Sequence, residues 1–531
     1  MNRTSVQSAQ RSSAQPLPAA GGHFCGTVRN FPLHITPPVL CIKGPSSAVS
    51  FLFSPSPLDH HSASSLSFLL AQHTSPPSPL SVMGFRWTSP LAQVIAVGFI
   101  CFCCPGMFNA LNSLGGGGQV DSKVGQNANV ALYTCFAIFG LLSGAIHNKL
   151  GPKWTIFIGC STYVLYAGSL LCYNHTKNGA FTIFAGGLLG VGAGMLWTAQ
   201  GAIMMAYPRE NDKGKFIGYF WAIFNAGAVL GSFIAFGINV NKKTSSSLGD
   251  STYIVFLILM SVGTLVALSL APPTAVTHSN GDKIKVQTFP SWKGEIVAVF
   301  KLFLDWRMVV LIPMFLSSNW FYSYQFSTVN GFYFSTRTQS LNNIFYWFSQ
   351  IGGSWAFARV LDYQGVNRRT RSYWGLSIVT ACFVATWIGG IFFQKDYTLQ
   401  SKGPEDGALN HDYSEGASYI GPLFLYMFYG LNDAAWQTYC YWLMGSLSND
   451  ISTLSRYAGF YKCIQSSGAA ISWRINAVST PFMTELIICF ALLVASLPGA
   501  IFLSSRIQDH SEEEGQAQGQ GQKSEKYEVD A

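Results

Sequence analysis

Residues 181–206 read FTIFAGGLLGVGAGMLWTAQGAIMMA and contain no charged side chain. A helix rises about 1.5 Å per residue, so this stretch is long enough to cross roughly 30 Å of hydrocarbon. The stretch therefore predicts a membrane-spanning helix.

Similar apolar stretches recur on both sides of this one. The sequence predicts twelve spans, in two groups of six that flank a polar segment. They cover residues 90–112, 126–147, 153–173, 181–206, 214–238, 251–271, 307–331, 342–361, 373–393, 418–443, 454–473 and 482–503. The predicted fold class is an all-α integral membrane protein with twelve transmembrane helices in two six-helix bundles. The predicted domains are the bundles 83–271 and 307–505, joined by a cytoplasmic loop, 272–306.

The composition excludes other classes of protein. Of the 531 residues, 49% are hydrophobic and 11% are charged, less than half the charge of a typical soluble domain. A solvated enzyme and a disordered scaffold are therefore excluded. The net charge of +8 is spread along the chain, so nucleic acid is not an expected partner. Cys101 and Cys104 form a C-x-x-C pair inside a span without a nearby histidine, so no metal site is expected.

The two ends of the chain differ from the spans. Residues 1–82 are rich in Ser and Pro and contain no sustained apolar run, so we expect them to be disordered. An alternative is that translation begins at Met83, where the sequence also matches the N-myristoylation pattern. The acidic tail 506–531 is also expected to be disordered.

The loop charges predict the orientation. If every even-to-odd connection is cytoplasmic, the cytoplasmic loops carry twice as many Lys and Arg residues as the opposite loops. This bias places both termini in the cytosol. Asn174 in the Asn174-His175-Thr176 tripeptide then falls in an outside loop, which makes it a candidate glycosylation acceptor and the chain a candidate glycoprotein.

The loop between the second and third predicted spans reads GAIHNKLGPK, residues 144–153. Gly144 permits a close helix approach and Gly151 a tight turn, while Lys149 and Lys153 stay in the cytosol. The loop resembles the G-x-x-x-D-R/K-x-G-R/K signature of the major facilitator superfamily, at the place where that superfamily carries it.

Two positions depart from that signature. Asn148 stands where the superfamily has Asp, and Pro152 where it often has Arg. An amide can cap a neighbouring helix, but it cannot form a charge-assisted gate with an arginine. The latch that the resemblance implies is therefore not expected at Asn148.

A matching loop lies between the eighth and ninth predicted spans. It carries Asp362, Gly365 and Arg368, so the acid is retained here. Paired half-repeats with matching loops are typical of transporters built from two six-helix bundles.

Four further motifs are more specific. They are NALNSLGGGG at 109–118, GMLWTAQG at 194–201, YGLNDAAWQ at 429–437 and GFYK at 459–462. Together they resemble the uncoordinated-93-like branch of the major facilitator superfamily, in its fungal form. The resemblance covers about residues 90–503 and implies a twelve-helix transporter-like fold. It does not imply a substrate, because animal relatives include channel regulators and a receptor-trafficking chaperone.

Two ionisable side chains are expected inside the membrane. Asp433 lies ten residues before the end of its span, and Lys462 eight residues after the start of the next. At about 1.5 Å per residue both lie roughly 12–15 Å from the same membrane face, so adjacent antiparallel helices can pair them. One hypothesis is a titratable pair that couples the movement of solute or protons, and the other is a fixed structural bridge.

Other polar side chains are candidates for the substrate or coupling site. Such amides either line a pore or bond neighbouring helices. With Asp433 and Lys462, the candidates are Gln437, Gln200, Trp197, Asn109, Asn112 and Gln325. The glycine ladder Gly186, Gly190 and Gly194, with the pair Gly227 and Gly231, is predicted to pack helices.

These observations predict a secondary transporter that moves a small solute by alternating access, with the lipid bilayer as its surroundings and a proton or cation as a coupled ion. No phosphate-binding loop is present, so ATP is not the expected driver. No catalytic residues and no cofactor are predicted. The alternative is a non-transporting regulator or trafficking chaperone with another membrane protein as its partner.

Overall fold

The computed structural model describes residues 86–114, 122–241, 248–278, 280–284, 291–401 and 409–508. The segment 1–82, the acidic tail 509–531 and the glycines 115–118 lie outside these residues. Contacts divide the chain after Ser81, and the unit from Val82 onward holds the helices described below.

The first predicted span is helical throughout. It consists of α1 (Pro90–Cys101), the π-helical turn η1 (Phe102–Gly106) and α2 (Met107–Asn112). The Ser89 hydroxyl caps the start by accepting from the Ala92 N–H at 3.3 Å. Pro105 has no N–H to donate, and it lies inside the π-helical turn.

The next helices are α3 (Ser122–Thr176), α4 (Gly179–Ala206), α5 (Lys213–Asn239) and α6 (Asp250–Val266), with the short turns η3 (Glu210–Asp212) and η4 (Ala267–Ser269). α3 contains two predicted spans, 126–147 and 153–173. The expected loop between them is reduced to a kink, because within α3 only Gly151 leaves helical geometry, with φ of 75°. That conformation suits glycine, as the sequence predicts.

The second group begins with a broken helix. The predicted span 307–331 is split into α8 (Trp306–Val309), α9 (Ile312–Ser317) and the π-helix η7 (Tyr324–Gly331). Pro313, in the first turn of α9, cannot donate the hydrogen bond that would continue α8. α10 (Thr336–Leu361), α11 (Arg368–Gln394), η8 (Tyr413–Glu415), α12 (Ala417–Gly445), α13 (Ile451–Ala477) and α14 (Phe482–Ser504) follow.

The segment 272–306 is not simply an aqueous loop. It contains η5 (Pro273–Ala275), α7 (Trp292–Lys301) and η6 (Leu302–Leu304). Glu295 and Val299 on α7 are fully buried, while Trp292 and Phe300 are exposed. α7 therefore buries an acidic residue and leaves large apolar side chains on its exposed face.

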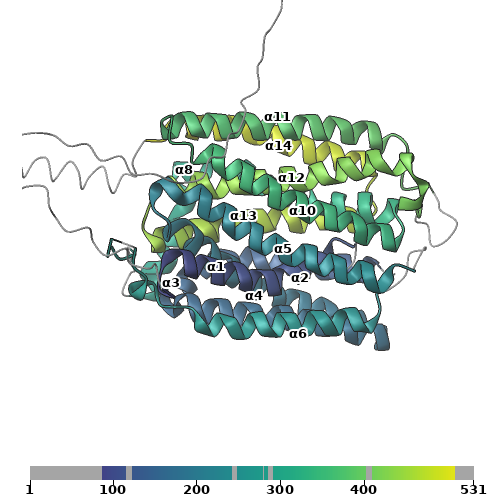
Figure 1. The fold of residues 1–531 in the computed structure, drawn as a ribbon, viewed down its shortest axis with the longest axis horizontal. Coiled ribbons are helices and arrows are strands. Elements are labelled where there is room, and N and C mark those ends of the chain that lie inside the picture. The colour runs from purple at the N-terminus through teal and green to yellow at the C-terminus, as the bar shows by residue number, and fades with distance from the viewer. Residues whose placement is uncertain are drawn as a thin grey trace, which may run out of the picture. The chain divides into compact units, whose positions relative to one another are not determined.

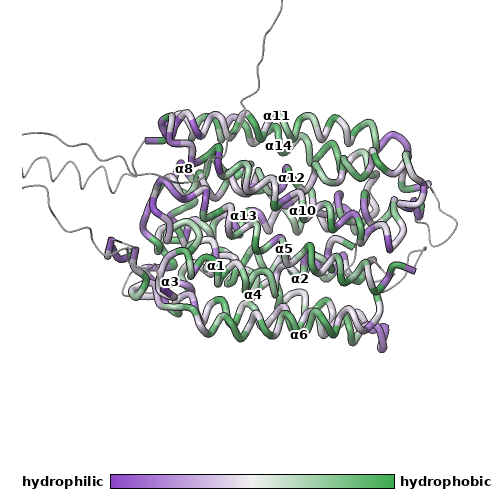
Figure 2. The backbone as a smooth tube through the Cα atoms, viewed as in Figure 1, coloured by the Kyte–Doolittle hydropathy of each residue, from purple (hydrophilic) through white to green (hydrophobic). Residues whose placement is uncertain are grey.

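Seven helices of the described residues are long and apolar enough to cross a membrane. They lie at Pro90–Asn112, Lys123–Thr176, Gly179–Ala206, Lys213–Asn239, Asp250–Ser269, Arg368–Gln394 and Phe482–Ser504. The chain is thus a multi-pass membrane protein. α10, α12 and α13 are of similar length but are not among these seven, and they carry many buried polar side chains. Figure 2 shows long apolar stretches along α6 and α11.

Contacts between the two groups of helices define where a site can lie. α3 packs against α13, and α10 packs against α5 (Figure 1). Small residues allow the close crossings: a Cβ at Gly144 would lie 3.0 Å from the Ser455 carbonyl oxygen on α13. The glycine ladder of α4 faces α3, where a Cβ at Gly190 would lie 2.1 Å from the Leu132 carbonyl oxygen. The contacts of this ladder agree with the predicted packing role.

Candidate functional site

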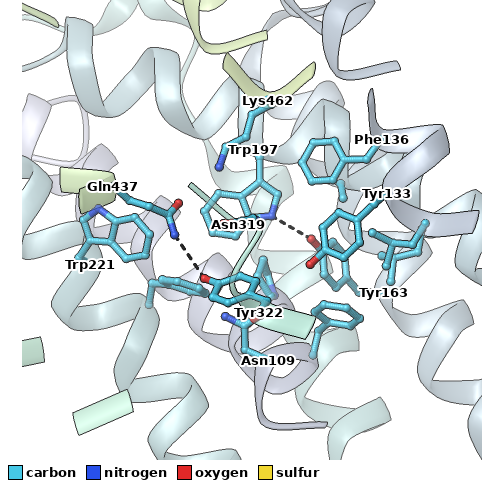
Figure 3. Close-up of a pocket in the computed structure, with 16 residues that line it drawn as sticks. Asn109, Tyr133, Phe136, Tyr163, Trp197, Trp221, Asn319, Tyr322, Gln437 and Lys462 are labelled. Carbon is cyan, nitrogen blue, oxygen red and sulfur yellow. Dashed lines mark hydrogen bonds between the residues drawn. The ribbon is translucent and has the colours of Figure 1, made fainter. Parts of the chain in front are cut away.

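A cavity with about 510 Å³ of empty space lies among helices of both groups (Figure 3). The lining residues are Pro105, Phe108, Asn109, Leu132, Tyr133, Phe136, Tyr163, Leu189, Ala193, Trp197, Trp221, Phe224, Asn319, Tyr322, Gln437 and Lys462. Four candidates named from the sequence are among them: Asn109, Trp197, Gln437 and Lys462.

Aromatic rings form much of the cavity wall. Trp197 packs edge-on against Phe224 at 5.2 Å between centroids, and its indole N–H donates to the Tyr163 hydroxyl at 3.1 Å. Trp221 packs against Phe224 at 5.4 Å. Its indole nitrogen is buried and finds no hydrogen-bond partner among the described residues. Because these rings hold one another in fixed orientations, the wall is rigid.

Lys462 on α13 points into this aromatic wall (Figure 3). Its Nζ donates to Gln465 Oε1 at 2.7 Å and lies 4.6 Å from the Trp197 ring centroid and 4.9 Å from that of Tyr461. Lys462 is the one charged side chain among the described lining residues. Cation–π contacts and one amide therefore stabilise the ammonium group.

Asp433 on α12 lies outside this cavity. Its carboxylate accepts hydrogen bonds from the Tyr322 hydroxyl at 2.8 Å, Gln350 Nε2 at 2.8 Å and Gln437 Nε2 at 2.7 Å. It lines a second space of about 240 Å³ together with Gln325 and the Trp387 ring. The side chains of Asp433, Tyr322, Gln350 and Gln437 thus form one buried hydrogen-bond network.

The structure corrects the expected direct pairing of Asp433 with Lys462. No ion pair joins them in the described part of the chain, and two amides lie between them. Gln465 accepts from Lys462 and donates to Gln437 Oε1 at 3.2 Å, and Gln437 donates to Asp433. The sequence places both ionisable groups at similar depth, but long amide side chains fill the gap between them.

The remaining candidates bond neighbouring residues and do not line the main cavity. Asn112 accepts from Asn129 Nδ2 at 2.7 Å, and Gln325 accepts from the Tyr346 hydroxyl at 2.9 Å. Gln200 is buried on α4, where its Nε2 contacts the Met204 sulfur at 3.4 Å. In the structure, these amides therefore contact other side chains of the protein.

At the end of the helices that carries residues 144–153, a cluster of four side chains joins α3, α7 and α13. This Glu295 cluster consists of Asn148, Glu295, Ser455 and Arg456. Glu295 Oε2 accepts from Asn148 Nδ2 at 3.0 Å and from Arg456 Nε at 3.1 Å. The Ser455 hydroxyl donates to Asn148 Oδ1 at 2.8 Å. One carboxylate oxygen therefore accepts from both donors, and it joins position 148 to Arg456.

Asn148 itself forms no ion pair with an arginine, as the sequence predicts, and the carboxylate that pairs with Arg456 is that of Glu295. The acid is supplied by α7, from a segment that the sequence predicts to be solvated. Glu295 is 0% exposed and Arg456 8%, so this ion pair is shielded from water.

The second loop makes a corresponding contact. Asp362 accepts from the backbone N–H groups of Gly214 at 2.9 Å and Lys215 at 2.5 Å, at the start of α5. Lys213 Nζ in turn donates to the carbonyl oxygen of Gly445, the last residue of α12, and to that of Ser448 just beyond it. A carboxylate at a helix N-terminus is favoured by the unpaired N–H groups there. Burial raises the pKa of Asp362 to about 6, although these two N–H groups and the charge of Arg371 act in the opposite direction.

The other residues of the two loops have separate environments. Lys153 lies 6.0 Å from the Trp154 ring centroid, while Lys149 is half-buried. Arg368 is buried at the start of α11, and a Cβ at Gly365 would meet the Tyr363 ring at 2.4 Å. None of these four loop residues lines the cavity.

Asn174 lies within the last turn of α3. Its side-chain nitrogen, the atom to which a glycan would be attached, donates to Asp250 Oδ1 at 2.9 Å and to the Leu248 carbonyl oxygen at 3.2 Å. Glycosylation at Asn174 stays a prediction, and it requires that both bonds be broken.

The opposite end of the helices is closed by polar contacts as well. Gln126 at the start of α3 donates to Asn476 Oδ1 near the end of α13 at 2.9 Å. Asn330 of η7 donates to the Ser113 carbonyl oxygen at 3.0 Å. Asn476 also donates to both oxygens of Glu485, a buried carboxylate on α14. Contacts between the two groups of helices thus exist at both ends, with the cavity between them.

Sequence reasoning missed several residues of these networks. Glu295 stands in a polar segment with no sign of burial, and Glu485 is a single acid near the start of an apolar stretch. An isolated acid inside a span is a signal that points to Glu485. Tyr322 and Trp221 are ordinary aromatic residues in sequence, and only the packing of the helices brings them to the cavity.

The family model described as ion channel regulatory protein UNC-93 matches residues 116–498. The chain belongs to the UNC-93 family. The expected uncoordinated-93-like resemblance is therefore confirmed.

Individual UNC-93 relatives match over most of their length. UNC93-like protein 1 of Arabidopsis thaliana is 47% identical over 419 residues, which are 79% of this chain and 91% of the relative. An UNC93-like protein of Schizosaccharomyces pombe is 46% identical, over 77% of this chain and 81% of the relative. Among solved structures, a major facilitator superfamily transporter, FucP, in the outward conformation is 12% identical with a TM-score of 0.52, over 78% of this chain and 98% of FucP. This last likeness shows the major facilitator fold.

Proposed function

We propose that this UNC-93 family member moves a small solute across a membrane by alternating access, without ATP. The observation that carries the proposal is the central cavity, which lies between two groups of helices that contact each other at both ends. A transporter of this kind opens one set of end contacts while it keeps the other.

The proposed architecture has twelve crossings. α3 supplies two of them around its kink, the broken helix from α8 to η7 supplies one, and the polar helices α10, α12 and α13 supply three. The two bundles are residues 83–271 and 307–505, with 272–306 and both termini in the cytosol. The buried network of Asp433, Gln437, Gln465 and Lys462 is the proposed place for a coupled proton or cation.

The test measures the uptake of a panel of solutes of different charge into proteoliposomes. Uptake is compared before and after the contact at one end of the helices is cross-linked. Gln126 and Asn476 are in contact, so Gln126→Cys and Asn476→Cys can be joined by a short bifunctional methanethiosulfonate. We expect the joined variant to lose uptake and a reducing agent to restore it. Each single cysteine variant, treated in the same way, is the control. Uptake that persists after joining would contradict alternating access.

A second candidate function is the regulation of another membrane protein. The observation that favours it is the description of the matching family model as an ion channel regulatory protein. A regulator of this kind would bind its partner with the same affinity before and after the cysteines are joined, and it would show no uptake of any solute in the panel.

A further inference from the structure

We propose that the central cavity binds a small organic anion that carries a flat apolar group, with the Lys462 ammonium as its counter-ion. The inference deepens the proposed transport function, because it names the class of solute. Binding is measured without transport, so the two proposals can fail separately.

The charge of the cavity wall is the first argument. Lys462 is 3% exposed, and its ammonium group donates to one neutral amide, Gln465. The acidic residue of this hydrogen-bond network is Asp433, which lines a different cavity. Its carboxylate accepts from Tyr322, Gln350 and Gln437. A buried charge without an opposite charge in contact is costly. An anionic group in the cavity would supply that contact.

The hydrogen-bonding groups of the wall are the second argument. The Trp221 indole nitrogen can only donate, and it is buried with no partner among the described residues. The Tyr163 hydroxyl already accepts from Trp197, which leaves its own proton to donate. Asn319 Oδ1 accepts from Gln465, which leaves its NH2 group as the donor. These three groups offer donors, with which the acceptors of a ligand can pair.

The shape of the wall is the third argument. Eight of the 16 lining residues are aromatic, and the packing of Trp197 and Trp221 against Phe224 fixes the planes of these rings. Flat apolar groups pack against such faces and edges. A hydrated inorganic anion would leave this apolar surface unused, and an organic cation would be repelled by Lys462.

The experiment compares three probes of nearly equal shape that differ in charge: phenylacetate, phenylacetamide and 2-phenylethylamine. Equilibrium binding is measured with radiolabelled probes on the full chain in lipid nanodiscs. We expect phenylacetate to bind at least tenfold more tightly than phenylacetamide, and 2-phenylethylamine to bind more weakly than either. Equal binding of the three probes, or a preference for the amine, would overturn the proposal.

Variants assign the preference to Lys462. Lys462→Met should reduce phenylacetate binding to the level of phenylacetamide, while phenylacetamide binding stays within twofold of the parent. Lys462→Arg keeps the charge and should keep most of the preference. Trp221→Phe removes one donor and should weaken phenylacetate severalfold. Lys395→Met, at an exposed site on α11, is the matched control and should change nothing.

A Lys462→Met variant that keeps the full preference would overturn the assignment to this cavity. If that variant does not fold, the comparison of the three probes on the parent and on Lys462→Arg still decides the proposal. If phenylacetate binds but no solute of the panel, labelled phenylacetate included, is taken up into proteoliposomes, the anion site is supported and transport is contradicted. A different outcome is that uptake of other solutes is blocked by joining the two cysteines and restored by reduction, while binding shows no preference for the anion. That outcome would support transport and contradict the anion site.

Discussion

Asp433 accepts hydrogen bonds from donors on three parts of the chain: Tyr322 near η7, Gln350 on α10 and Gln437 on its own helix. All three are donors, so the site suits an ionised carboxylate, which accepts and does not donate. The same arrangement shows why Asp433 is more than a partner for Lys462. It ties together helices on one side of the cavity.

We expect Asp433→Asn to lower the free energy of unfolding by about 1–3 kcal/mol, because the new NH2 group faces donors and leaves at least one of them unpaired. The measurement is thermal or denaturant unfolding of the whole chain in detergent. Asp396→Asn, at an exposed position after α11, is the control and should have little effect. Equal losses in the two variants would show that the Asp433 network contributes nothing of its own.

Asp362 predicts a pH dependence of stability. Its pKa of about 6 in the folded protein lies above the ordinary value of 3.8, so the folded state binds this proton more tightly than the unfolded state does. The stability from this group is therefore complete below pH 3.8 and is lost as the pH rises through about 6. We expect the melting temperature of the parent to fall relative to that of Asp362→Asn as the pH rises through this window. A difference that is constant from pH 4 to pH 7 would contradict the assignment.

For single residues, the sequence predicts which side chains lie inside the protein better than it predicts their hydrogen-bond partners. The position along one helix predicts that Asp433 and Lys462 lie inside the unit, and both are buried there. Partners follow from the orientation of other elements. Tyr322 lies on a broken helix whose geometry no local pattern records, and Gln350 is a polar residue in a span with weak apolar character.

Among the elements, α7 has the largest effect on the interpretation of the sequence. A short helix in a polar segment carries no apolar stretch long enough to predict burial. Its buried face becomes visible only when Val299 and Glu295 are packed against the end of the unit. The broken helix from α8 to η7 is a second case, since the hydropathy of 307–331 is that of one continuous span. Hydropathy is an average over a window and does not record such a break.

The Glu295 cluster predicts that an acid can be exchanged between two elements. Glu295→Gln should cost about 3–5 kcal/mol of stability, because it removes the buried carboxylate that accepts from Arg456. Asn148→Asp added to Glu295→Gln should recover more than half of the loss, since the two positions are in contact. Asn148→Asp alone brings two carboxylates together and should also destabilise the protein.

The measurement is the four-variant cycle of unfolding in detergent, with Lys301→Gln at the exposed end of α7 as the control. A strong negative coupling energy, in which the double variant is more stable than either single variant, is the expected outcome. Additive losses would show that the acid must stand on α7 and that position 148 cannot replace it.

For the whole helical unit, the apolar stretches predict the order and approximate bounds of the long helices well. Eleven of the twelve predicted stretches match long helical stretches among the described residues, and the exception is the broken one. The orientation in the membrane follows from loop charge alone and has not been tested by the fold.

Orientation can be measured by labelling in sealed microsomes, whose outer face is cytosolic. Asn280→Cys lies in the proposed cytosolic segment, and Ser414→Cys lies beyond α11 on the other side; both positions are exposed. We expect a membrane-impermeant maleimide to label Asn280→Cys without detergent and Ser414→Cys only after detergent is added. The parent chain, with its own cysteines, gives the background. The reverse pattern would invert the proposed topology.

The position of Glu295 also has a consequence for how relatives of this chain are recognised. The contact with Asn148 joins residues 147 positions apart, so the carboxylate lies beside position 148 in space but far from it in the sequence. A pattern search that demands an acid at position 148 would reject such a chain, although its chemistry is intact. Alignments scored column by column treat the two positions as independent, whereas selection on this contact would make them covary: an acid at either site, and seldom at both.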